Sequence, residues 1–456
     1  MTIFSAIFER FVQKSPVAVL ARALMERVFC PAVLDDWFAR TADRQYTRTL
    51  LFSTLFDLMS QVVCGLHASV GAAYQAAEAS VGVSVQAVYE KLKHLEVMTS
   101  AALVRHTAAT VIPVIQELGG PRPPVFPGYR LKILDGNCLA VTEHRLAALR
   151  TVAAGALPGK SLVVYEPALG LPTDVFPCED GHAQERALLG AVLETVQAGD
   201  VWMADRNMCT RSFTCSLDDR WACFVIREHE NYPWESAGPE VFAGHSETGA
   251  VYEQPITVTD EGGGRHTFRR IRLVLTTATR DGDFELALIS NLPPTTAGAI
   301  DIADSYRTRW TIETAFQELV EHLQSELKTL GYPPAALFGF CVALVAYMLL
   351  QVTRAALRQA HGAAMVNQVV SGYYLADELS GVSRGMLIAL PDEEWQPFRT
   401  MTTAEFVAEL VRIASHATLS RYRKHPRGPK KPAPKKVYAK QQPHVSTARL
   451  LREKAG

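Results

Sequence analysis

The segment YRTRWTIETAFQEL, residues 306–319, places a phenol, two arginines and a carboxylate ahead of an apolar run. Residues 299–330 contain no Gly or Pro, so a helix can run there without a break. At a period of 3.6, Tyr306, Arg309 and Glu313 share one stripe, spaced three and four. A buried face beside it is formed by Ile312, Phe316, Leu319 and Leu323. Two interpretations stay open: an Arg–Glu pair on a solvated face, or a catalytic carboxylate beside phosphate-binding groups.

Two aspartates follow apolar strand patterns. In YRLKILDG, the period of two puts Asp135 on the face of Leu131 and Ile133. In DVWMADRN, it puts Asp205 on the face of Val201 and Met203. Ligand sites of α/β sheets collect at the carboxyl ends of strands, although a single Asp there is commonly a turn or cap residue.

Three converging carboxylates without paired His or Cys ligands suit hard, oxygen-preferring cations such as Mg²⁺ or Mn²⁺. Two such ions about 4 Å apart can activate a water or a 3′-hydroxyl and stabilise the leaving oxygen of a phosphodiester. Without metal, the carboxylates would repel each other and the phosphate. Asp135, Asp205 and Glu313 are therefore the candidate catalytic residues and metal ligands, and Arg309 could contact a backbone phosphate.

The order ILDG … ADRN … YRTRWTIETAF resembles the DDE transposases of bacterial insertion sequences, in the insertion-sequence-four family. The resemblance covers roughly residues 128–350. It implies a ribonuclease H-like core, catalytic Asp135, Asp205 and Glu313, and Tyr306 and Arg309 positioning the backbone of the transposon end. The family's Y-x2-R-x3-E signature often continues with a lysine seven positions later, where this chain has Val320.

The patterns predict a mixed α/β fold, with a ribonuclease H-like sheet flanked by helices. Strands are expected over 129–135, 161–167, 172–177, 200–205 and 221–228, and a helix over 182–199. The expected regions are a helical DNA-binding domain (1–118), a Gly/Pro-rich linker (119–128), the first part of the core (129–230), a β-rich insertion (231–283), the second part of the core with the catalytic helix (284–355), a helical region (356–420) and a basic, disordered tail (421–456).

Three smaller features have competing interpretations. Ala79–Glu96 suits a helix-turn-helix with Lys91 and Lys93 on DNA, but ordinary helical hairpins share this pattern. Trp234 could stack on an extruded base, although packing is the preferred interpretation, and Trp310 is expected to pack beside the catalytic helix. Most of the polar residues Glu179, Asp180, His182 and Glu185 are expected to cap a helix.

The net charge of −1 hides an asymmetry. Residues 421–456 contain twelve Lys and Arg and a single acid, Glu453, so they carry +11 and the first 420 residues carry −12. This charge favours a nucleic-acid partner through Lys430, Lys431, Lys435 and Lys436, although a solvated tail has the same composition.

Two further observations concern the compartment. The eight cysteines form no CxxC pair or disulfide-like spacing, which is typical of a reduced, intracellular protein. Ala335–Val352 contains no charge and could just span a bilayer, but a buried helix is the preferred interpretation over a membrane anchor.

The expected activity is that of a DNA transposase. It would bind terminal inverted repeats in double-stranded DNA, cleave at the element's ends with two Mg²⁺ or Mn²⁺ ions and join the 3′-hydroxyls to target DNA. The resemblance implies a homodimer on DNA, no membrane contact and a bacterial, cytoplasmic, nucleoid-associated location. The alternatives are a catalytically inactive, transposase-derived DNA-binding protein and a plain ribonuclease H-like nuclease.

Overall fold

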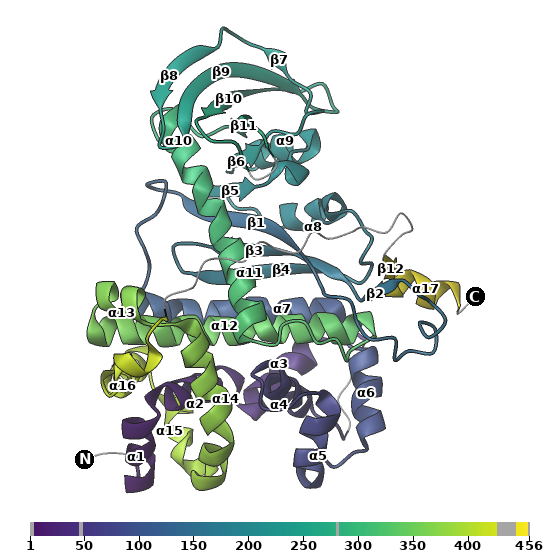
Figure 1. Cartoon of the computed structure of the whole chain (residues 1–456), viewed down its shortest axis with the longest axis vertical. Helices are drawn as coiled ribbons and strands as arrows, with labels where there is room; N and C mark the ends of the chain where they lie inside the picture. The colour runs from purple at the N-terminus through teal and green to yellow at the C-terminus, as the bar shows by residue number, and fades with distance from the viewer. Residues whose placement is uncertain (1–3, 45–48, 280–281, 426–443, 455–456) are drawn as a thin grey trace.

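The protein is elongated and built in tiers (Figure 1). The computed structural model describes residues 4–44, 49–279, 282–425 and 444–454. A β-rich end, a central sheet and a helical tier follow one another along the longest axis, and the long helices α7 (Val97–Glu117) and α12 (Pro333–His361) lie between the sheet and the remaining helices.

The central sheet contains five core strands: β1 (Arg130–Cys138), β3 (Lys160–Glu166), β4 (Leu171–Cys178), β5 (Asp200–Ala204) and β6 (Cys223–Arg227). Their order is β4-β3-β1-β5-β6. Strand β3 is antiparallel to β1 and to β4, whereas β5 is parallel to β1 and to β6. Three antiparallel strands followed by two parallel ones form a ribonuclease H-like sheet, so the predicted fold class is confirmed.

Alternate residues of these strands enter two separate hydrophobic clusters. Ile133 and Met203 pack on the face covered by the helix α11 (Trp310–His322), which contributes Ile312 and Leu319 to the same cluster. Leu134 and Trp202 belong to the opposite cluster, which includes residues of α8 (Leu189–Leu193) and α9 (Arg211–Asp219). The period of two therefore puts Asp135 and Asp205 on the same face as Ile133 and Met203, toward α11.

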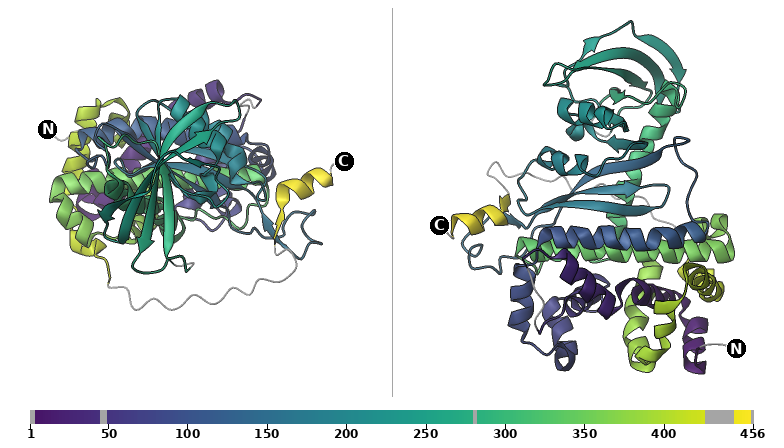
Figure 2. Two further views of the ribbon diagram at one scale, coloured as in Figure 1. Left: turned by 90° about the horizontal axis from the view of Figure 1, so that it is seen from above. Right: turned by 180° about the vertical axis from the view of Figure 1, so that it is seen from behind.

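The β-rich segment extends the core sheet rather than forming a sheet of its own. It comprises β7 (Glu235–Ser236), β8 (Val241–His245), β9 (Gly249–Thr259) and β10 (Arg265–Leu275). Strand β11 (Glu285–Ser290) pairs antiparallel with both β6 and β10, and the described part of the sheet has ten strands. Figures 1 and 2 show these strands curling at one end of the molecule.

The helical tier combines helices from the N-terminal part of the chain with helices of residues 363–415. Its N-terminal helices are α1 (Ala6–Lys14), α2 (Pro16–Phe29), α3 (Pro31–Thr41), α4 (Phe52–Val63), α5 (Val70–Val81) and α6 (Val85–Lys93). Its C-terminal helices are α13 (Ala363–Val369), α14 (Gly372–Ala389), α15 (Gln396–Thr400) and α16 (Thr403–Ser415), with the 3₁₀ turn η4 (Asp392–Glu394). Helix α2 packs on α14, α15 and α16, and Glu26 pairs with Arg399 at 2.7 Å. The helices α1–α6 and α13–α16 thus form a common layer.

Two described helices, Val97–Glu117 and Pro333–His361, are long and apolar enough to cross a membrane. In the second, 94% of the most apolar window is buried inside the protein, where α12 packs on α7, α16 and β4. The apolar composition of Ala335–Val352 is therefore accounted for by core packing, and the predicted buried helix is confirmed.

Two helix predictions need correction. Residues 299–330 are divided into α10 (Ala299–Ser305), the 3₁₀ turn η3 (Tyr306–Arg309) and α11, which ends at His322. Residues 182–199 contain only the 3₁₀ turn η1 (Glu185–Leu188) and the short α8. There, the side chains of Glu185 and Arg186 bind the turn η2 (Arg206–Met208) instead of lining a helix face.

The tail is not disordered throughout. After the turn η5 (Leu419–Tyr422), the chain returns as β12 (His444–Ser446) and α17 (Thr447–Glu453). Strand β12 pairs parallel with β2 (Gly155–Leu157), Ser446 is buried, and Arg449 pairs with Asp180 at 2.7 Å. These contacts correct the prediction for residues 444–453. Lys430, Lys431, Lys435 and Lys436 lie outside the described residues.

Candidate functional site

The two aspartates are brought together by strand pairing. Strands β1 and β5 are parallel neighbours, and Leu134 faces Ala204 in the register. Asp135 directly follows Leu134, and Asp205 directly follows Ala204. Both carboxylates therefore lie at the same edge of the sheet. Asp135 lies within β1, which continues to Cys138, whereas Asp205 follows the end of β5.

Arg309 joins the first and third carboxylates. Its Nη1 donates to Oδ2 of Asp135 at 2.9 Å, and its Nη2 donates to Oε1 of Glu313 at 2.8 Å. The Arg309 side chain is 12% exposed and that of Glu313 is 53% exposed. The Arg–Glu pair of the first interpretation is therefore present, and its arginine also reaches the aspartate of β1.

The electrostatics of Asp135 are those of a carboxylate kept from water. Burial raises its pKa to about 6, against an ordinary value of 3.8. Arg309 lowers the pKa, while the charges of Asp205 and Glu313 raise it. The charges of the other two carboxylates thus oppose the ionisation of Asp135, and a nearby cation would relieve that repulsion.

Tyr306 links the turn η3 to the sheet. Its hydroxyl donates to the carbonyl oxygen of Ala204 at 3.3 Å, one residue before Asp205. The Arg309 guanidinium carbon lies 5.9 Å from the centre of the Tyr306 ring. Burial raises the pKa of the Tyr306 phenol, which therefore stays protonated and able to donate. In this structure the phenol positions the backbone around Asp205.

A fourth acidic residue, Glu185, binds the turn that follows Asp205. Asn207 donates from Nδ2 to Oε2 of Glu185 at 2.5 Å, while the backbone N–H of Asn207 donates to Oδ1 of Asp205 at 2.9 Å. A Cβ at Gly136 would lie 2.1 Å from Oε1 of Glu185, so a larger residue there would displace the Glu185 carboxylate. The sequence analysis treated Glu185 as a cap. Gly136 and Asn207 are the sequence features that could have indicated this role of Glu185, because the first makes room for its carboxylate and the second binds it.

The carboxylates fit a divalent cation in chemistry but are not arranged to hold one. Across the described residues, no group of three or more His, Cys, Asp and Glu side chains is placed to bind a metal ion. Arg309 lies between Asp135 and Glu313 as their counterion. Carboxylate oxygens are nevertheless the donors that Mg²⁺ and Mn²⁺ prefer. A bound cation would require Arg309 to release at least one carboxylate.

The predicted DNA-binding residues of the helical tier have local contacts. Helices α5 and α6 are joined at Gly82, which has a φ of 69°, and the Ser84 side chain caps α6, as the helix-turn-helix pattern predicts. Lys91 lies over the Phe38 ring at 5.1 Å, and Lys93 lies 3.4 Å from Glu90. Both lysines are half-buried, so their ammonium groups are not a free basic face.

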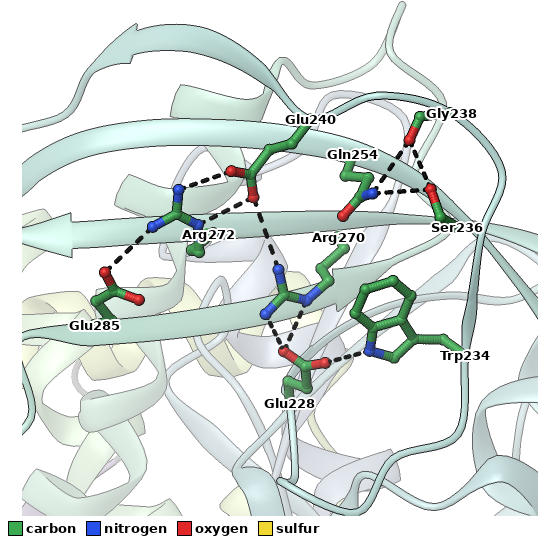
Figure 3. A network of polar contacts seen from close by, with 9 residues as sticks. All are labelled: Glu228, Trp234, Ser236, Gly238, Glu240, Gln254, Arg270, Arg272 and Glu285. Carbon is green, nitrogen blue, oxygen red and sulfur yellow. Dashed lines mark hydrogen bonds and ion pairs between the residues drawn. The ribbon is translucent and has the colours of Figure 1, made fainter.

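The tryptophans near the site have different environments. Trp234 donates from Nε1 to Glu228 at 2.7 Å, and Arg270 covers its ring at 5.1 Å. Figure 3 shows this pair within a network that continues through Glu240 and Arg272 to Glu285. Trp234 therefore packs against Arg270, which confirms the preferred interpretation. Trp310 is 59% exposed, so its predicted packing is wrong.

The fold and these carboxylates define a ribonuclease H-like domain of the DDE type. Comparison with protein families agrees: residues 127–349 match the family model described as the transposase DDE domain. Enzymes with this domain generally use divalent metal ions.

The other comparisons add little. No curated protein matches the chain. Among solved structures, the chain is similar to the piggyBac transposase synaptic complex with hairpin DNA, at 11% identity and a TM-score of 0.35, covering 87% of this chain and 75% of that one. A likeness of this size carries no argument about the present chain.

Proposed function

We propose that this protein is a DNA transposase of the insertion-sequence-four type. It would bind terminal inverted repeats in double-stranded DNA, cut at the element's ends and join the freed 3′-hydroxyls to target DNA, acting as a homodimer. The observation that carries the proposal is the meeting of Asp135, Arg309 and Glu313 within a transposase DDE domain.

The chain's own residues would act by position and charge. Asp135, Asp205 and Glu313 would hold two Mg²⁺ or Mn²⁺ ions, which supply a Lewis acid for the phosphodiester and its attacking oxygen. Tyr306 keeps the backbone before Asp205 in place, and Arg309 offers a planar fork to a backbone phosphate once it leaves a carboxylate. Glu185 holds the turn after Asp205 through Asn207.

The test is metal-dependent cleavage and joining with purified protein. The substrate is a plasmid carrying the DNA that flanks the gene, incubated with Mg²⁺ or Mn²⁺ and with EDTA as the control. Asp135→Ala, Asp205→Ala and Glu313→Ala should each lower cleavage at least a thousandfold, because removing any ligand disrupts both ions. Asp36→Ala, which removes an exposed carboxylate on α3, is the matched control and should retain cleavage.

The products separate this proposal from its alternatives. Joined strands support a transposase, whereas cleavage without joining supports a plain nuclease. The other alternative is an inactive, transposase-derived DNA-binding protein, and the presence of all three carboxylates argues against it. Retained DNA binding without cleavage in any divalent metal would establish that alternative. Cleavage that survives all three alanine substitutions would rule out the assigned site.

A further inference from the structure

A polar cavity opens beside α11, on the side away from the β-rich end. It is lined by α11 from Thr314 to His322, by the last turns of α12, by the start of α14 and by Arg122 from the Gly/Pro-rich segment. Thr314 directly follows Glu313 in the chain. With a rise of about 1.5 Å per residue, the cavity extends from Glu313 along roughly 12 Å of the helix.

Four cationic side chains and two carboxylates line this cavity, so its formal charge is positive without any contribution from histidine. The cations are Arg122, Arg354, Arg358 and Lys424, and the carboxylates are Glu318 and Glu321. Arg354 is neutralised by Glu318 through two hydrogen bonds, of 2.9 and 3.2 Å. This pairing leaves most of the positive charge with the other cations.

Arg358 is the distinctive residue of the cavity. Its Nε is buried and has no hydrogen-bond partner, and within the described part of the chain Arg358 forms no ion pair. Burial lowers its pKa, and the charges of Arg122 and Arg354 lower it further. Arginines that crowd one another without an anion are costly, so the arrangement is suited to a ligand that supplies negative charge.

One wall of the cavity is formed by the start of α14. A Cβ at Gly372 would lie 2.1 Å from Nη2 of Arg354 and 2.9 Å from the His322 ring, so glycine is what lets the start of α14 approach these side chains. Lys424 donates from Nζ to the carbonyl oxygen of Asn367 at 2.6 Å, which holds its ammonium group at the rim. Several segments that are distant in sequence thus converge on one cationic space.

We propose that this cavity binds a backbone phosphate of the DNA strand whose neighbouring phosphodiester lies at Asp135, Asp205 and Glu313. Successive phosphates of one strand are roughly 3.4 Å apart along the duplex axis, so a few nucleotides cover the distance along α11. Val320, where the resembling family often has lysine, is 54% exposed and offers no cation. Arg358 and Arg122 supply the charge from other elements. This inference rests on the proposed function.

The experiment measures binding of a fluorescent duplex with the gene's flanking sequence over a series of NaCl concentrations. Arg358→Gln and Arg122→Gln should each weaken binding and reduce the slope of log K against log salt by about 0.7 to 0.9 for each phosphate that the variant no longer binds. Arg358→Lys should keep the slope, because it keeps the charge. Arg10→Gln, an exposed arginine on α1, is the matched control and should change neither quantity.

The outcomes separate the cavity from the catalytic proposal. If wild-type protein binds the duplex and both glutamine variants bind with unchanged affinity and slope, the cavity assignment is overturned. Asp135→Ala protein should bind the duplex but not cleave it in Mg²⁺, whereas the control Arg10→Gln protein should do both.

A second arm distinguishes a DNA phosphate from a free anion. The melting temperatures of wild-type and Arg358→Gln protein are compared in sodium phosphate and in NaCl of equal ionic strength. A rise in phosphate that disappears in Arg358→Gln, together with unchanged salt slopes on DNA, would identify a free-anion site and overturn the strand assignment. If Arg358→Gln loses the rise in melting temperature in phosphate and also shows a reduced salt slope on DNA, the cavity is a phosphate site used by DNA.

Discussion

Arg309 is the residue on which the resting state of the site depends. It binds Asp135 and Glu313 at once, at 2.9 and 2.8 Å. The same guanidinium compensates the carboxylates without metal and has the shape to bind a phosphate. A site of this kind would exchange one counterion for others, so that its charge stays balanced before and after a substrate arrives.

The ionisation of Asp135 predicts how stability depends on pH. The folded protein holds this proton more tightly than the unfolded chain, because the folded pKa is about 6 and the ordinary value is 3.8. Wild-type stability should therefore fall as pH rises from about 4 through 6. Asp135→Asn, which cannot ionise, should be more stable than wild type at pH 8 by up to about 3 kcal/mol and equal to it near pH 4.

Thermal or urea unfolding at pH 4 and pH 8, without divalent metal, measures this difference. Asp36→Asn, which changes an exposed aspartate on α3, serves as the control and should show a much smaller dependence. A larger advantage of Asp135→Asn at pH 4 than at pH 8 would contradict the assigned pKa direction.

At the scale of elements, the site depends on the close approach of η1 to β1. The Glu185 carboxylate lies where a Cβ at Gly136 would be, and the same carboxylate accepts a hydrogen bond from Asn207. The turn after β5 is therefore held by a residue from the preceding segment, and the glycine after Asp135 makes room for it.

Gly136→Ala should displace Glu185 and release Asn207. Loss of a hydrogen bond to a charged group predicts destabilisation by about 1.5 to 3 kcal/mol, together with reduced cleavage because Asp205 is less well held. The double variant Gly136→Ala/Glu185→Ala should recover stability relative to Gly136→Ala, because the clash is gone, but not full activity. Unfolding free energies of the two single variants and the double variant measure this coupling. Additive effects would show that the two residues do not interact.

At the scale of the whole molecule, the chain's C-terminal segment closes on the core. Strand β12 pairs with β2, and Arg449 pairs with Asp180. The desolvation of Asp180 is outweighed by hydrogen bonds from Arg449 and from the backbone N–H of His182, and its pKa is lowered to about 2. The basic residues between η5 and β12 are thus joined to described structure on both sides. Removing the end of the chain and removing its charge are therefore different perturbations.

Replacing Lys430, Lys431, Lys435 and Lys436 with glutamine should leave the melting temperature unchanged and flatten the salt dependence of DNA binding, by about 0.9 for each phosphate that is no longer neutralised. Deleting residues 444–456 should instead lower the melting temperature, because β2 loses its partner strand and the buried Ser446 and Thr447 are removed. Differential scanning calorimetry and anisotropy titrations measure the two effects. An unchanged salt slope in the lysine variant would remove these residues from the DNA-binding surface.

The elements of the core could be predicted from local pattern. The strands around Ile133 and Met203 follow the period of two, and each side chain enters the hydrophobic cluster expected for its face. Gly82 and Ser84 specify a turn and a cap through their own backbone and hydroxyl chemistry. The burial of Ala335–Val352 follows from its composition in a chain otherwise rich in charge.

Contacts between distant segments could not be predicted, because they depend on which side chains the fold brings together. The hydrogen bond of Glu185 to Asn207, the half-buried positions of Lys91 and Lys93 and the return of β12 to β2 leave no periodic signal. The 3₁₀ turn at Tyr306–Arg309 interrupts a segment whose composition favours a continuous helix. Tertiary packing overrides propensity there, since Tyr306 reaches Ala204 across the sheet.

By itself the sequence determined the types and order of the reactive groups: two aspartates after strands, then a tyrosine, an arginine and a glutamate at helical spacing. Only the tertiary structure decided that Arg309 lies between two of these carboxylates and that Arg122 and Arg358 share a cavity beside α11. The reason is physical: periodicity is a property of neighbouring residues, whereas charge compensation depends on distances between residues far apart in the chain.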